Sequence, residues 1–185
     1  ASLVIPSILV SLGVGLILNG ASVNTSDKDE ITAAEEFILK QKPNIGAFRY
    51  DIIPLVTAGD MAASHYYVGA VLNANQSPDK LGFVIPEEGA TMYQEDICML
   101  KTAPNAANAL KFLEFMMRPD VSAKNTERLT NGSVNTAAIA LLPDELKNHP
   151  AVNPPAEMRA KLQIFDDLGK SLRLYTRAWD RVKTN

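Results

Sequence analysis

Cysteine and histidine are scarce in this sequence. Of its 185 residues one is a cysteine, Cys98, and two are histidines, His65 and His149. A single cysteine excludes a disulfide within the chain and makes a cysteine-based zinc site implausible. The two histidines lie far apart and show no metal-ligand spacing. We therefore expect neither a metal nor a cofactor, and we expect Cys98, which lies in an apolar run, to be a small buried core residue.

A surplus of positive charge is also missing. The sequence has 18 lysines and arginines against 21 aspartates and glutamates, which gives a formal net charge of -3 at pH 7. Binding to nucleic acid depends on cations that neutralise phosphates, so this balance argues against a nucleic-acid partner. The hydrophobic fraction of 46% is ordinary for a soluble globular protein, and the length suffices for one or two domains.

No long uninterrupted hydrophobic run is present. The first charged residue is Asp27, but the apolar part of the stretch before it, Leu3 to Leu18, is interrupted by Pro6, Gly13 and Gly15. This part is shorter than the roughly 20 residues that a membrane-spanning helix needs. We expect a buried helix here, with its core at residues 6–12 and its end near Gly13, and residues 14–17 either extend it or begin a loop. A signal-like or membrane segment is the alternative.

Catalytic motifs are absent as well. Gly13-Val14-Gly15 lacks the flanking pattern of a phosphate-binding loop, and no serine has the G-x-S-x-G context of a hydrolase. Glu87 and Glu88 are adjacent, and adjacent residues at a strand end point apart, which disfavours shared acid–base catalysis. We therefore do not expect an enzyme; a small hydrolase that uses one of its carboxylates is a minor alternative.

The most informative stretch that is present runs from Gly82 to Leu100. Its two apolar runs, residues 83–86 and 96–100, are bounded by turn signals and predict two buried strands. Tyr93 and Glu95 lie between these runs. Burying a charge is costly unless a partner of opposite charge meets it, so these residues suggest contact with a cation; a solvated loop is the plainer interpretation.

The rest of the chain alternates short apolar runs with amphipathic segments, which predicts an α/β fold. We expect strands at residues 45–50 and 61–65. We expect helices at residues 29–41, 52–58, 105–117, 119–129, 155–163 and 166–182, with a further one reaching residue 74.

Several segments carry a family resemblance. They are EGATMYQEDICML (88–100), KFLEFMMRPDV (111–121), NTAA (135–138), NPPAEMRAKL (153–162) and TRAWDRVK (176–183). Together they resemble the C-terminal half of the periplasmic polyamine-binding proteins, the solute receptors of ABC importers for putrescine and spermidine. The tail is most similar to the putrescine-binding branch.

The resemblance implies a fold and a division of the chain. The fold is of the type II periplasmic-binding-protein class, and mature members of the family are nearly twice as long as this chain. Residues 1–81 would then be an α/β segment of the second lobe. Residues 82–135 would be hinge strands and helices that cross to the first lobe, and residues 136–185 C-terminal helices that return to the second.

The resemblance also implies ligand-binding residues. Glu95 stands where the family has its cleft aspartate, Tyr93 where it has a tryptophan or phenylalanine, and Tyr67 where a tryptophan ends a strand. Asn131 takes the place of a tyrosine of the putrescine branch, and Ala70 the place of an acid. Tyr67, Tyr93, Glu95 and Asn131 are thus the candidate ligand residues. The resemblance implies a polyamine or a related cationic amine as ligand, and the departures leave open a smaller or less cationic amine or another solute.

Partners and location follow from the same resemblance. We expect a periplasmic receptor that delivers a cationic amine to the membrane permease of an ABC importer. A ligand-sensing lobe of a signalling system is the alternative. Because half of such a receptor would leave apolar surface uncovered, a homodimer of this chain is a further expectation.

Overall fold

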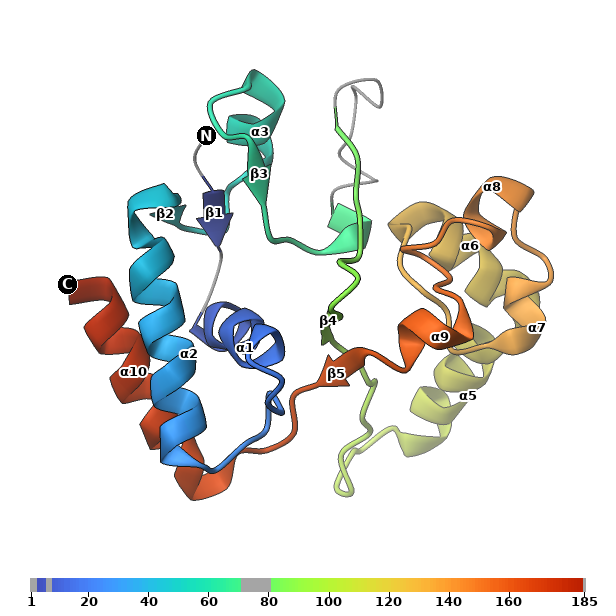
Figure 1. Ribbon diagram of the computed structural model, residues 1–185. Helices are drawn as coiled ribbons and strands as arrows, with labels where there is room; N and C mark the ends of the chain where they lie inside the picture. The colour runs from blue at the N-terminus through green and yellow to red at the C-terminus, as the bar shows by residue number, and fades with distance from the viewer. Residues whose placement is uncertain (1–2, 6–7, 71–80, 185) are drawn as a thin grey trace. The chain divides into compact units, whose positions relative to one another are not determined.

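The computed structural model describes residues 3–5, 8–70 and 81–184 (Figure 1). The chain forms two compact units. Unit 1 comprises residues 1–66, 76–93 and 156–185, and unit 2 comprises residues 67–75 and 94–155. Helices and parallel strands occur together, as the α/β prediction requires. The predicted assignment of segments to the lobes of a longer receptor stays a prediction.

Unit 1 contains two small parallel sheets. In the first sheet β1 (Leu3–Ile5) lies between β2 (Ile45–Phe48) and β3 (Ala63–Ser64). In the second, β4 (Ala90–Met92) pairs with β5 (Leu162–Ile164), so that Ala90 lies opposite Leu162. The strands expected at residues 45–50 and 61–65 are therefore present but shorter.

Three helices enclose the main core of unit 1. They are α1 (Ile8–Leu18), α2 (Lys28–Gln41) and α10 (Leu172–Thr184). The buried residues of this core are Leu12, Leu16, Ala21, Ile31, Ala34, Tyr175 and Ala178, of which Ala21 lies in the loop between α1 and α2. The ring of Trp179 on α10 meets Phe48 of β2 edge to face, with 4.9 Å between the ring centroids. The shorter helices α3 (Ile53–Ala58) and α9 (Ala156–Arg159) also belong to this unit.

Helix α1 continues past Gly13 and Gly15 to Leu18, so residues 14–17 extend the helix rather than begin a loop. A Cβ on Gly13 would lie 3.0 Å from Thr91 of β4, and one on Gly15 would lie 2.9 Å from the carbonyl oxygen of Ala34. Both glycines therefore allow close packing of α1, against the second sheet and against α2, and this packing outweighs their low helix propensity. Within the described residues no helix is long and apolar enough to cross a membrane.

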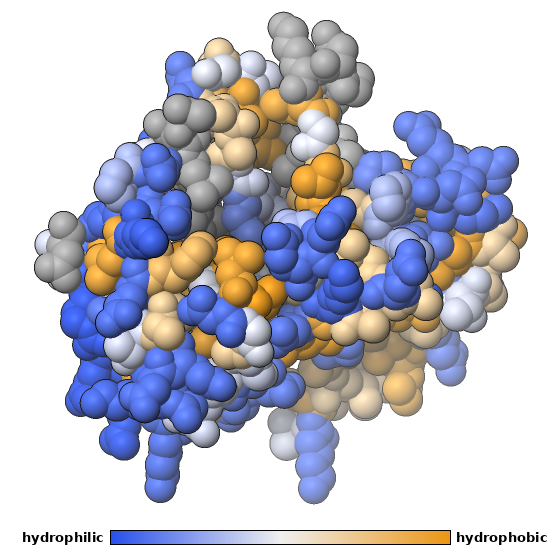
Figure 2. Space-filling model, in the orientation of Figure 1, coloured by the Kyte–Doolittle hydropathy of each residue, from blue (hydrophilic) through white to orange (hydrophobic). Residues whose placement is uncertain are grey.

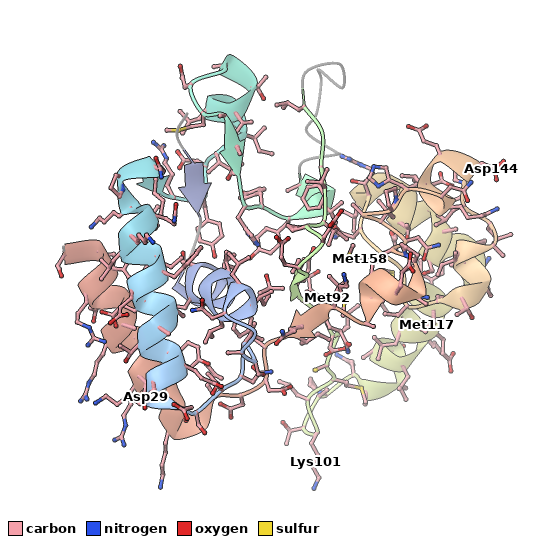
Figure 3. The ribbon with its side chains drawn as sticks, in the orientation of Figure 1. Asp29, Met92, Lys101, Met117, Asp144 and Met158 are labelled. Atoms are coloured by element: carbon pink, nitrogen blue, oxygen red, sulfur yellow. The ribbon has the colours of Figure 1, made fainter. Side chains whose placement is uncertain are left out.

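Local signals set the ends of α2 as predicted. The Asp27 carboxylate accepts hydrogen bonds from the backbone N–H groups of Asp29 (2.7 Å) and Glu30 (3.3 Å), which caps the helix. Asp29 is labelled at this end of α2 in Figure 3. The helix ends at Gln41, two residues before Pro43. The outward faces of α2 and α10 are hydrophilic (Figure 2).

The regular elements described in unit 2 are helices. Its helices are α5 (Ala106–Met117), α6 (Pro119–Leu129), α7 (Thr136–Ile139) and α8 (Asp144–Lys147). The predicted helices at 105–117 and 119–129 are thus confirmed to within a residue. Asn135 caps α7, since its Oδ1 accepts from the N–H of Ala138, and its Nδ2 donates to the Met117 carbonyl at 2.8 Å. The helix expected to reach residue 74 is seen only at 68–70, because its remainder lies outside the described residues.

Four expectations about the middle and end of the chain are wrong. Residues 83–86 and 96–100 are not strands; the strand of this region is β4, which lies between them. Cys98 is exposed rather than buried. The helix expected at 155–163 is the single turn α9 followed by β5, and the last helix begins at Leu172, not near residue 166. A strand requires a hydrogen-bonding partner, and this requirement explains why β4 and β5 are strands at residues where we expected none.

Candidate functional site

Tyr93 and Glu95 follow directly after β4. Pairing with β5 fixes the strand up to Met92, which Figure 3 labels, and the chain then leaves the sheet in an irregular segment. The Tyr93 side chain is 41% exposed, and Glu95 is exposed as well. The side chain of Asp96 accepts a hydrogen bond from Gln94 Nε2 at 3.1 Å. An exposed ring and an exposed carboxylate two residues apart are chemically able to meet a cation.

Asn131 packs closely against Gly69, in the segment that follows Tyr67. Gly69, two residues after Tyr67, is buried, and a Cβ there would collide with the Asn131 side chain and lie 2.5 Å from the Leu129 carbonyl oxygen. The Thr130 hydroxyl donates to the Gly69 carbonyl at 3.0 Å. Only glycine fits at position 69, and this close approach brings Asn131 to the segment that carries Tyr67.

The Asn131 side chain has a buried oxygen that needs a donor. No donor from the described residues forms a hydrogen bond with its Oδ1. A buried carbonyl oxygen without a partner is unfavourable, and an N–H or ammonium group would relieve that cost. No local pattern indicates this contact, because Gly69 and Asn131 are far apart along the chain.

Three of the four predicted ligand residues lie close in sequence to a point where the chain passes from one unit to the other. The chain passes from one unit to the other between residues 66 and 67, 75 and 76, 93 and 94, and 155 and 156. Tyr67 and Tyr93 are each the residue next to such a crossing, and Glu95 is the second residue after one. Asn131 lies within unit 2.

A separate pocket of about 260 Å³ lies in unit 1 between α2 and α10. Lys28, Ile31, Thr32, Leu174, Arg177 and Arg181 line it, and none of these is a predicted ligand residue. Its three cationic side chains would repel a cationic amine. Within the described residues no group of three or more His, Cys, Asp or Glu side chains could hold a metal ion.

Comparison with known proteins identifies a family over most of the chain. Residues 8–154 match the family model described as bacterial extracellular solute-binding protein. The putrescine-binding periplasmic protein SpuD of Pseudomonas aeruginosa is 30% identical over 173 residues, and the putrescine-binding periplasmic protein PotF of Escherichia coli is 31% identical over 174 residues. Each match covers 89% of this chain but 47% of the relative, so the chain spans about half the length of these relatives.

Solved structures give the same result for the fold. A protein from Listeria monocytogenes is 28% identical, with a TM-score of 0.80 over 98% of this chain and 57% of that one. The substrate-binding protein PotD of a spermidine/putrescine ABC transporter from Streptococcus pneumoniae is 23% identical, with a TM-score of 0.83. These likenesses confirm the predicted type II periplasmic-binding fold, of which the chain forms a part. By its match over residues 8–154, the chain belongs to the bacterial extracellular solute-binding proteins.

Proposed function

We propose that this chain is part of a periplasmic receptor that binds a polyamine or a related cationic amine and delivers it to the permease of an ABC importer. The observation that carries the proposal is the family match over residues 8–154, together with relatives named for putrescine and spermidine. The formal net charge of -3 is compatible with a cationic ligand.

The residues that we propose for the ligand supply the contacts that a diamine requires. Each ammonium group needs a carboxylate or another acceptor, and an aromatic face adds about 0.5–2 kcal/mol through cation–π attraction. Glu95 would be the carboxylate partner, and the rings of Tyr67 and Tyr93 would flank the methylene chain. Asn131, whose Oδ1 lacks a described donor, would accept from an N–H of the ligand.

Two features favour a ligand that differs from putrescine in size or charge. Glu95 is one methylene longer than the aspartate of the resembled family, which shifts an ammonium outward or shortens the ligand that fits. Position 70, where the putrescine branch has an acid, is an exposed alanine. The site would therefore have one carboxylate fewer than that of the putrescine branch. A diamine would lose the partner of one ammonium group, whereas an amine with a single ammonium group would not.

We further propose that the chain has no catalytic activity. The proteins that it resembles are named as solute-binding proteins, and this supports binding without turnover. Neither a signalling lobe nor a carboxylate-dependent hydrolase is favoured by a particular residue or contact of this chain.

Calorimetry on the protein at the length its gene encodes tests the function. Putrescine, spermidine and a monoamine would be titrated, with a sugar and an acidic amino acid as controls for other solute classes. We expect micromolar affinity for at least one amine and none for the controls. Tight binding of a control solute without amine binding would refute the proposal.

The 185-residue chain alone serves as the second sample. It spans about half the length of its relatives, so we expect it to bind amines weakly or not at all. Micromolar putrescine binding by this chain would contradict that expectation and would place all essential contacts within these 185 residues.

A further inference from the structure

Helices α2 and α10 run side by side and in the same direction in unit 1 (Figure 1). Just after the end of α2, the Lys42 Nζ donates to the Val182 carbonyl of α10 at 2.7 Å. One to two turns before that end, the buried carboxylate of Glu35 accepts from Nε and Nη2 of Arg181. These contacts fix the two helices against each other. The pocket of about 260 Å³ described above lies on the N-terminal side of them and includes Arg181 in its wall.

This pocket has an apolar base and a cationic rim. Ile31 is only 3% exposed and Leu174 is partly buried, so these two form the base. Lys28 and Arg177 are exposed and form the rim. Each cation lies three residues from the apolar side chain of its own helix, a spacing that places both on one side of that helix. A molecule in the pocket would therefore contact hydrocarbon at the base and positive charge at the rim.

Two of the positive charges at the pocket have no counter-charge among the described residues. The charge of Arg181 is matched by Glu35. Neither Lys28 nor Arg177 has a described carboxylate oxygen within 4.0 Å of its side-chain nitrogens. Two like charges at the rim of one pocket attract an anion more strongly than either does alone.

The acidic residues at the start of α2 do not supply the counter-charge. At 3.6 residues per turn, Asp29 and Glu30 lie about 100° and 200° around the helix from Lys28, whereas the other α2 residues of the pocket lie within about 60° of it. Asp27 caps the helix and accepts from the backbone N–H groups of Asp29 and Glu30. These backbone donors are thus already occupied, and the pocket depends on side chains rather than on the helix terminus.

Phosphate and carboxylate groups are the anions that these two cations can recognise. The guanidinium group of Arg177 can donate two parallel N–H bonds to two oxygens of such a group, and the ammonium group of Lys28 adds charge and further donors. The apolar base favours a ligand with an apolar part over a fully hydrated ion. The volume of about 260 Å³ is below the roughly 300–1,000 Å³ of sites for drug-sized ligands, so the ligand is small.

We propose that the pocket between α2 and α10 is a second ligand site, which binds a small organic anion. Lys28 and Arg177 hold the phosphate or carboxylate group of this anion, and its apolar part rests on Ile31 and Leu174. All four residues belong to unit 1, and none is a candidate residue for the amine. The inference is independent of amine binding, because the two sites take ligands of opposite charge.

Chemical shifts of backbone amides would detect and locate the binding. The sample is the protein at the length its gene encodes, at low ionic strength, and the probes are phenyl phosphate, benzoate and inorganic phosphate. We expect phenyl phosphate and benzoate to shift the amides of residues 28–32 and 174–181, with dissociation constants of about 1 mM or lower. Inorganic phosphate has no apolar part and should bind about 10-fold more weakly. Benzylamine, which has a ring but the opposite charge, should leave these amides unshifted.

A double substitution tests the two cations. Lys28→Gln with Arg177→Gln changes exposed side chains only, so the midpoint of urea unfolding should stay within the range of surface substitutions. The affinity for phenyl phosphate should fall by about 10-fold or more. Lys40→Gln with Arg159→Gln is the matched control, since it removes one lysine and one arginine that are exposed and lie outside the pocket. The control should change the affinity by less than about twofold.

Four results would overturn the proposal. The first is that no free anion shifts the amides of residues 28–32 and 174–181. The second is equal affinity for inorganic phosphate and phenyl phosphate, which would indicate an adventitious ion only. The third is an equal loss of affinity in the two double variants, which would assign the binding to overall charge. The fourth is a response to phosphatidylglycerol vesicles without a response to free anions, which would make a membrane headgroup the ligand.

Discussion

The hydroxyl group of Tyr175 on α10 donates to the backbone carbonyl of Val23 at 2.9 Å, and the Thr25 carbonyl lies at the same distance. The Tyr175 side chain is fully buried among α1, α2 and the loop that joins them. Burial, with a smaller contribution from the Glu30 carboxylate, raises the pKa of Tyr175 to about 12. The hydroxyl therefore remains a donor at any physiological pH and ties the C-terminal helix to a loop about 150 residues earlier.

Removal of this hydroxyl group tests how much its hydrogen bond between α10 and the loop contributes to stability. Tyr175→Phe keeps the ring in the core but leaves the buried carbonyl oxygen of Val23 without its donor. We expect a loss of about 1–3 kcal/mol in the free energy of unfolding, measured by urea titration. Tyr50→Phe is the matched control, since Tyr50 is 50% exposed, and it should change stability by less than about 0.5 kcal/mol. Equal effects of the two substitutions would contradict this role.

The ion pair between α2 and α10 gives a second prediction. Arg181 Nε and Nη2 donate to the two carboxylate oxygens of Glu35 at 2.6 and 2.5 Å, and the Glu35 side chain is only 7% exposed. Hydrogen bonding to this carboxylate raises the pKa of Arg181.

Arg181→Met would leave the Glu35 carboxylate buried without its partner. Since half of the arginine side chain reaches solvent, we expect a cost of about 1–2 kcal/mol rather than that of a fully buried pair. Lys183→Met breaks a pair with Asp180 whose members are both about half exposed, and should cost under about 1 kcal/mol. Thermal unfolding at low salt would compare them, and a larger loss for Lys183→Met would refute the prediction.

Glycine at position 89 is required by the second sheet. Gly89 has φ +115°, and a Cβ there would collide with the carbonyl oxygen of Lys161, next to β5. We expect Gly89→Ala to cost about 2–3 kcal/mol and to loosen the pairing of β4 with β5, measurable by hydrogen exchange at Thr91. Gly82→Ala, with open space around the added methyl group, should be nearly neutral. A neutral Gly89→Ala would show that β4 does not depend on this turn.

Acidification should destabilise the protein through His65. Burial lowers the pKa of His65 below its ordinary value of 6.5, and its Nδ1 has no hydrogen-bond partner in the described part of the chain. The unfolded chain thus binds a proton that the folded chain does not, so stability is full above pH 6.5 and falls as the pH drops below it.

Urea titrations between pH 7.5 and 5 would measure the effect, with a slope from this group of at most about 1.4 kcal/mol per pH unit. His65→Gln should remove that part of the slope. His149→Gln leaves His65 in place and serves as the control, so it should keep the part of the slope that comes from His65. An unchanged slope in His65→Gln would assign the acid sensitivity elsewhere.

Glu95→Gln tests the proposed carboxylate partner of the amine. In the protein at its encoded length we expect amine affinity to fall by about 10- to 100-fold, because a charge-assisted hydrogen bond contributes about 1.5–3 kcal/mol. Glu87→Gln removes the same charge from an exposed position and should weaken binding by less than about threefold. If both variants lose affinity equally, Glu95 acts through the overall negative charge of the protein and not through direct contact with the amine.

Local signals made the long helices predictable. Asp27 caps α2, Pro43 follows its end, and Pro119 begins α6, so each boundary depends on residues within one turn of it. The candidate ligand residues were chosen by resemblance, and their role stays a prediction. Tyr93 and Glu95 could be chosen from their segment, but the approach of Asn131 to Gly69 leaves no local pattern.

Strands were predicted poorly because composition does not supply a partner. Residues 97–100 have the composition of a strand and remain unpaired, whereas the unremarkable Ala90-Thr91-Met92 forms β4 because Leu162–Ile164 lies beside it. The same reason explains α1, whose glycines do not end the helix because neighbouring elements pack closely on them.

The amino-acid sequence by itself determined the family, the α/β class and the ends of helices such as α2 and α6, since these depend on motifs and caps within a few neighbouring residues. Tertiary structure alone decided which apolar runs became strands, which glycines lie inside a helix, and that Cys98 is exposed. Hydrogen-bond ladders and close packing form between residues far apart in the chain. The local sequence of a segment therefore does not specify which other segment will lie next to it.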